Sequence, residues 1–184
     1  LPGDRELVVA QIGADATLFV RAYKNSTTVA AVDSRLFQIK LSDLSIATLN
    51  AATARFSTSF GDAISDPRNL HGSKLAAGAV SGGTLFFSGF KDGGRKLYRF
   101  NSLAANPVEI QNLGTETVSQ LTTVYNAQQP SRSRMFFVRG SANTLYVTDG
   151  TTGNTTSTVK VHDPGNLSSE IVASGKLTSV AGKS

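Results

Sequence analysis

A short hairpin pattern recurs along this sequence at intervals of about fifty residues, and this repeat constrains the fold more than any other feature. Each copy has one polar residue followed by three apolar residues, and then a second apolar stretch further along the chain. The first halves of the three copies are residues 17–20, 84–87 and 134–137. Leu85 and Met135 lie 50 residues apart, whereas Leu18 and Leu85 lie 67 residues apart. The longer first interval predicts an insertion, which we place at residues 50–73.

The apolar stretches have the composition of β-strands. They are short, rich in Leu, Val, Phe, Tyr and Thr, and bounded by Gly, Asn, Asp or Ser, and no window carries a helical period with caps. Four strands in a repeat of roughly 40–50 residues are typical of a β-propeller blade. We therefore expect an all-β, β-propeller-like fold with about three four-stranded antiparallel blades and one strand of a fourth. The expected strands are 7–12, 16–23, 35–40, 45–49, 74–80, 84–90, 96–101, 107–112, 119–125, 134–139, 144–149, 156–161 and 175–180.

The whole chain, residues 1–184, is expected to be a single propeller domain or a piece of one. The expected blades are residues 7–49, 74–112 and 119–161, and residues 175–184 begin a further blade. A second repeat supports the further blade, because Asp-Pro-Arg-Asn-Leu at residues 66–70 returns 97 residues later as Asp-Pro-Gly-Asn-Leu at residues 163–167. Propellers close with four to eight blades. We therefore expect the missing blades to come from sequence beyond Ser184, from a second copy of the chain or from another subunit, and the end of the chain in a hairpin turn favours the first source.

Composition and charge exclude several classes of function. Cysteine is absent, which rules out disulfide scaffolds, thiolate metal sites and cysteine nucleophiles. No apolar run approaches the roughly 20 residues needed to cross a bilayer, so we expect no membrane span. The net charge of +5 would suit nucleic acid or an anionic polysaccharide. Because the basic residues are spread along the chain, we expect no nucleic-acid partner, while anionic glycans remain open.

No constellation of residues predicts catalysis, a cofactor or a metal, so no residue is assigned to any of these roles. The Asp-Gly-Thr sequence at residues 149–151 fits a tight turn with glycine at positive φ; a calcium site would need further carboxylates at ligand spacing. Asp92-Gly93-Gly94 fits a hairpin turn. His71 and His162 lack a third ligand for a metal, and we expect them to be loop residues.

Two polar or irregular loops are candidates for contact with a partner, because insertions in propellers emerge on one face, often the binding face. One loop is the insertion, and the other covers residues 125–134, which are polar and basic. The candidate contact residues are Phe56, Phe60, Gln128, Gln129, Arg132 and Arg134.

Residues 144–155, Thr-Leu-Tyr-Val-Thr-Asp-Gly-Thr-Thr-Gly-Asn-Thr, resemble a bacterial repeat family. Its members carry a Glu-Leu-Trp or Glu-Leu-Tyr strand followed by an Asp-Gly-Thr turn. The hairpin that precedes this strand in the family is matched by Gly-Gly-Thr-Leu-Phe-Phe at residues 82–87. The resemblance implies propeller-like blades within large secreted or surface proteins of bacteria, and it implies no catalytic residues.

The function that we expect is that of a non-enzymatic structural or adhesion module. It would be extracellular, at the cell surface or in the periplasm, and would dock into a larger bacterial assembly through protein–protein contacts. Its partners would be other protein subunits or further blades of the same protein. One alternative is a lectin-like propeller that binds glycans, and another is an enzyme whose channel site is completed by the missing blades.

Overall fold

In the computed structural model of the chain, the residues described are 7–12, 15–23, 34–40, 55–56, 64–73, 83–100, 107–124, 134–150, 158–163 and 166–170. Strands and turns account for this part of the chain, and it contains no helix. Every pair of neighbouring strands is antiparallel. The all-β class with antiparallel sheets is therefore confirmed.

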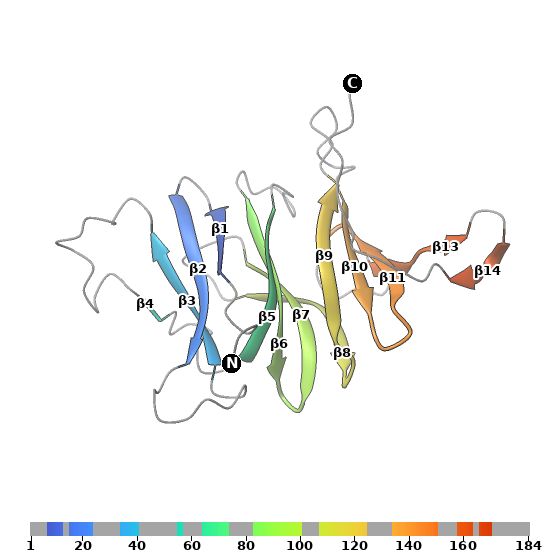
Figure 1. Cartoon of the computed structure of the whole chain (residues 1–184), viewed down its shortest axis with the longest axis horizontal. Helices are drawn as coiled ribbons and strands as arrows, with labels where there is room; N and C mark the ends of the chain where they lie inside the picture. The colour runs from blue at the N-terminus through green and yellow to red at the C-terminus, as the bar shows by residue number, and fades with distance from the viewer. Residues whose placement is uncertain are drawn as a thin grey trace, which may run out of the picture.

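Among the described residues, three sheets have four strands each and a fourth has two; Figure 1 shows how they are arranged. The first sheet comprises β1 (Leu7–Ile12), β2 (Asp15–Tyr23), β3 (Ser34–Lys40) and β4 (Arg55–Phe56). The second sheet comprises β5 (Ser65–Ser73), β6 (Thr84–Lys91), β7 (Gly94–Phe100) and β8 (Val108–Gly114). The third sheet comprises β9 (Val118–Val124), β10 (Arg134–Arg139), β11 (Thr144–Thr148) and β12 (Thr158–Lys160), and the fourth comprises β13 (His162–Asp163) and β14 (Asn166–Glu170). In each four-stranded sheet the strands lie in chain order.

The second sheet begins earlier than the sequence predicts. Both β4 and β5 lie within residues 50–73, which the repeat spacing assigns to an insertion. The physical reason is visible in the pairing of β5 with β6, which shifts register twice, between Ser65 and Arg68 and between Arg68 and His71. These irregularities break the period-two alternation that marks a strand in a sequence. The strands expected at 45–49, 74–80 and 175–180 lie outside the described residues.

The second sheet is buried on both faces. Leu85 and Phe87 of β6 pack against the first sheet, and Phe86 between them packs against the third. The cluster between the first and second sheets is Ala10, Ile12, Phe19, Leu36, Ile64, Leu85, Phe87, Tyr98 and Phe100. The cluster between the second and third sheets is Phe86, Leu97, Ile110, Leu113, Val118, Met135 and Phe137. Consecutive apolar residues in β6 thus reflect a strand with no solvent-facing side.

The first strands of consecutive sheets lie against one another: β1 contacts β5, and β5 contacts β9. The approach of β1 to β5 is close at Gly72. A Cβ added there would lie 2.7 Å from the Val9 carbonyl oxygen and 3.2 Å from the Ala10 Cβ. A side chain at this position would therefore push the two strands apart.

We predict that Gly72→Ala lowers the free energy of unfolding by about 1–3 kcal/mol, because the clash is with backbone that cannot rotate away. Gly94→Ala is the matched control, since a Cβ there would meet its nearest atom at 3.4 Å, an ordinary contact. Urea denaturation followed by circular dichroism measures both. Equal losses in the two variants would contradict the close approach of β1 and β5.

The hairpin between β6 and β7 has the predicted turn. Asp92 and Gly93 have φ values of 51° and 79°, and Lys91 pairs with Gly94, which is the geometry of a type I′ turn. Within the described ranges, no helix has the length and hydropathy needed to cross a membrane.

Candidate functional site

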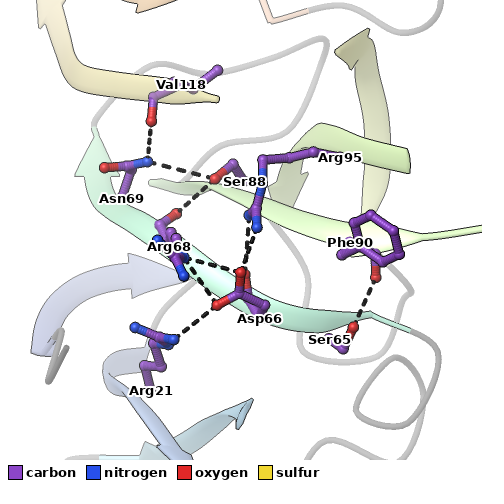
Figure 2. Close-up of polar contacts among 9 residues, drawn as sticks. All are labelled: Arg21, Ser65, Asp66, Arg68, Asn69, Ser88, Phe90, Arg95 and Val118. Carbon is purple, nitrogen blue, oxygen red and sulfur yellow. Dashed lines mark hydrogen bonds and ion pairs between the residues drawn. The ribbon is translucent and has the colours of Figure 1, made fainter. Parts of the chain in front are cut away.

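A buried carboxylate joins the first and second sheets. Asp66 of β5 accepts hydrogen bonds from guanidinium groups on three strands, those of Arg21 in β2, Arg68 in β5 and Arg95 in β7 (Figure 2). Arg21 Nη2 lies 2.8 Å from Asp66 Oδ1, and Arg68 Nε lies 2.9 Å from each carboxylate oxygen. Arg95 binds Asp66 Oδ2 and also the Asp66 carbonyl oxygen, at 3.2 Å. We call these four residues the Asp66 cluster.

Three of the four side chains of the Asp66 cluster are mostly removed from water, whereas that of Arg68 is 41% exposed. The side chains of Asp66 and Arg21 are 7% and 3% exposed, and that of Arg95 is 11% exposed. A charge in such a place is tolerated only when it is paired and hydrogen-bonded. The Arg21–Asp66 pair joins residues 45 apart in the sequence, so the cluster fixes the position of the second sheet on the first.

Asn69 joins the second sheet to the third. Its side-chain amide donates to the Val118 carbonyl oxygen of β9 and lies 3.5 Å from the Ser88 hydroxyl. The Ser88 hydroxyl in turn donates to the Arg68 carbonyl oxygen at 3.4 Å (Figure 2). One strand, β5, therefore carries polar contacts to both neighbouring sheets.

The backbone explains why the segment has its Asp and Asn. Asp66 and Asn69 have φ values of 48° and 57°, in the left-handed region that these two residue types adopt more readily than most others. Gln120 of β9 has a φ of 56° and lies at a shift in register against β10, between the pairs Thr122–Phe136 and Ser119–Val138. The irregularity is thus a shared feature of the first strands of two successive sheets.

His71 lies at the contact between β5 and β9. Its Nε2 is 3.2 Å from the Thr123 hydroxyl oxygen, and burial lowers its pKa below the ordinary value of 6.5. The expectation that both histidines are loop residues is wrong, because His71 lies in β5 and His162 in β13. In the described ranges, no group of three or more His, Asp or Glu side chains could hold a metal ion.

We predict that the protein loses stability as the pH falls through the range below 6.5, and that His71→Gln reduces this loss. The folded state disfavours the charged imidazole, so unfolding takes up a proton in this range and becomes easier. The stability that the neutral His71 side chain provides is fully present above pH 6.5, which is the pKa of an unperturbed histidine. Thr123→Val is the control, since it removes the hydroxyl and keeps the titrating group. Urea unfolding across this pH range measures the effect, and an unchanged pH profile in His71→Gln would contradict it.

Between the second and third sheets, Arg99 of β7 has two guanidinium nitrogens, Nε and Nη1, that are buried without a hydrogen-bond partner. Burial lowers its pKa, and the negative charge of Asp149 acts in the opposite direction. Asp149 belongs to the Asp-Gly-Thr sequence, where Gly150 has a φ of 79° and its amide donates to the Thr148 hydroxyl at 3.0 Å. The positive φ predicted for this glycine is confirmed.

The structure describes two of the six residues predicted to contact a partner, and it does not bring them together into one site. Phe56 ends β4, where its backbone pairs with Phe37. Arg134 begins β10, is half-buried and pairs with Val124. The other four, Phe60, Gln128, Gln129 and Arg132, lie outside the described residues. Their role as contact residues stays a prediction.

Reasoning from the sequence missed the Asp66 cluster and the bond from Asn69 to β9. The signal that could have found them is the return of Asp-Pro-x-Asn-Leu at residues 163–167.

A comparison with protein-family models, with curated proteins and with solved structures found no match to this chain.

Proposed function

We propose that this chain is a non-enzymatic structural module, a sector of a β-propeller whose open sheet faces bind further sheets of a larger protein assembly. The observation that carries the proposal is the arrangement of the three four-stranded sheets. Each has its strands in chain order, and the first strands β1, β5 and β9 lie against one another in sequence. Sheets that meet at their first strands are what a propeller requires around its axis.

The open face of the first sheet supports contact with protein. Leu7 and Val9 are 63% and 52% exposed, although Ala10 and Ile12 on the opposite face of β1 are buried. Leu7 pairs with Val20 and Val9 with Leu18, and paired residues share a face of the sheet. Exposed apolar residues that lie together on one sheet face are a feature of protein interaction sites.

The resemblance of residues 144–155 to bacterial secreted and surface repeats supports an extracellular location, at the cell surface or in the periplasm. In that setting the module serves as a rigid structural or adhesion element. Its partners are other protein subunits or further blades of the same protein.

Hydroxyl-radical footprinting tests the proposal, comparing the isolated chain with the assembly purified from its natural source. We expect Leu7 and Val9 to be oxidised in the isolated chain at high dilution and protected in the natural assembly. Phe87, which is fully buried, is the internal control and should resist oxidation in both samples. Equal oxidation of Leu7 and Val9 in the two samples would count against a structural module with a covered sheet face.

A further inference from the structure

The peptide bond between Asp66 and Pro67 lies inside the Asp66 cluster, where one guanidinium group contacts two groups of the same residue. Arg95 donates from Nη1 to the Asp66 carbonyl oxygen at 3.2 Å, and from Nη2 to the Asp66 carboxylate oxygen Oδ2 (Figure 2). The two donor nitrogens belong to one rigid, planar group. Arg95 therefore holds the carboxylate beside the backbone carbonyl of its own residue.

The backbone at this bond is strained. Asp66 has a φ of 48°, whereas a residue that precedes proline ordinarily has an extended conformation with negative φ. Strained backbone of this kind persists only where the surrounding structure holds it in place. Here the guanidinium groups of Arg21 and Arg68 also bind the Asp66 carboxylate. Breaking the bond after Asp66 would release the strain.

We propose that the chain cleaves itself between Asp66 and Pro67. One oxygen of the Asp66 carboxylate attacks the Asp66 carbonyl carbon and forms a cyclic anhydride. The bond from this carbon to the Pro67 nitrogen breaks, and the nitrogen takes its electron pair and a proton from water, leaving as a secondary amine. Water then opens the anhydride, which restores the side-chain carboxylate and leaves a second carboxylate at the new chain end. The overall reaction consumes one water molecule.

The contacts of the Asp66 cluster supply what this reaction needs. Negative charge develops on the Asp66 carbonyl oxygen as the carboxylate attacks, and Arg95 already donates to that oxygen, so the charge is stabilised without rearrangement. Holding the two reacting groups together lowers the entropic cost of the attack. The Arg68 side chain is 41% exposed, so water reaches the edge of the cluster for the second step.

The cleavage would divide the covalent chain between the first and second sheets without separating them. After the broken bond, β5 still pairs with β6 through Arg68 and His71, and the hydrophobic cluster between the two sheets is unchanged. The two pieces should therefore remain associated, and each chain is cut once. This processing step goes beyond the proposed structural function and does not depend on it.

Mass spectrometry under denaturing conditions tests the inference, on purified chain that has been kept either folded in neutral buffer or unfolded in urea. We expect the folded chain to yield fragments of residues 1–66 and 67–184. The rate at this bond should be at least about tenfold higher in the folded chain than in urea. In urea, the Asp66–Pro67 and Asp163–Pro164 bonds should break equally slowly, because neither then has a folded environment.

Water enriched in heavy oxygen gives an independent readout of the mechanism. Opening of the anhydride places the label in the Asp66 side chain as well as at the new chain end. Direct attack of water on the peptide bond places it at the new chain end alone. We expect label in both positions.

Arg95→Lys tests the role of the guanidinium, because it keeps the positive charge and removes the planar contact with both groups. Cleavage should slow at least about tenfold. Arg139→Lys is the matched control, the same substitution in the pair with Glu116 of the third sheet, and should cleave like the unmodified chain. Circular dichroism checks that both variants fold; if Arg95→Lys does not, the comparison with urea and the label decide.

Four results would each overturn the inference. They are a folded chain that stays intact, cleavage no faster in the folded chain than in urea, label confined to the new chain end, and a folded Arg95→Lys that cleaves as fast as Arg139→Lys.

Discussion

Replacing either Phe86 or Phe87 with alanine is expected to lower the free energy of unfolding by about 3–5 kcal/mol. The two residues are consecutive in β6, and both are fully buried. Neighbouring side chains in a strand point to opposite faces of the sheet. A sheet with one solvent-exposed face would therefore expose either Phe86 or Phe87. Equal large losses are therefore the signature of a sheet packed on both sides. Phe86→Ala would create a cavity that faces the third sheet, and Phe87→Ala would create one that faces the first sheet.

Phe90→Ala in the same strand is the control for this comparison. Its ring is 40% exposed, so we expect a loss of under about 1 kcal/mol. Chemical denaturation of the three variants gives the free energies of unfolding, with one common dependence on denaturant concentration used for all of them. A large loss at only one of Phe86 and Phe87 would show that the second sheet has a solvent-facing side.

Asp66→Asn should cost about 3–5 kcal/mol, the range found when one partner of a buried ion pair is removed. The substitution keeps the size of the side chain and removes its charge. Arg21, with a side chain 3% exposed, would then keep its charge away from water without its carboxylate. The contact between the first and second sheets should therefore weaken.

Glu116→Gln is the matched control, an acid-to-amide change in a pair that water reaches. Glu116 binds Arg139 with its side chain 48% exposed, and exposed pairs contribute at most about 1 kcal/mol. Thermal and urea unfolding of both variants give the comparison. If Asp66→Asn proved as mild as Glu116→Gln, the Asp66 cluster would not be a structural link between the sheets.

The regular strands could be predicted from the sequence because a strand without register shifts keeps a period of two residues along its whole length. The expected strands at 84–90 and 144–149 correspond to β6 (Thr84–Lys91) and β11 (Thr144–Thr148). Strand β5 could not be predicted, since its register shifts twice and it carries only one large aliphatic residue, Leu70. A bulged strand has no fixed period for a sequence pattern to reveal.

The repeat of Asp-Pro-x-Asn-Leu marks the segment that carries Asp66, but the rest of the Asp66 cluster could not be predicted from the sequence. Its arginines come from three strands, and Arg21 is 45 residues from Asp66, so no local spacing connects them. The repeated Asp-Pro-x-Asn-Leu segment was visible, but its meaning depends on the left-handed backbone at Asp66 and Asn69. The contact loops were predicted from their polarity and length alone. Of the six candidate contact residues, Phe56 and Arg134 lie in described strands.

One nuclear Overhauser spectrum of the unmodified chain tests the central claim, that the first strands of successive sheets lie against one another. The account predicts a cross-peak between the Gly72 α-protons and the Ala10 methyl group, which joins β5 to β1. It predicts a second between the His71 ring and Thr123, which joins β5 to β9. The pairing of Gly72 with Leu85 within the second sheet provides the internal reference. Reference cross-peaks without the two between sheets would contradict the stacked arrangement on which the proposed function depends.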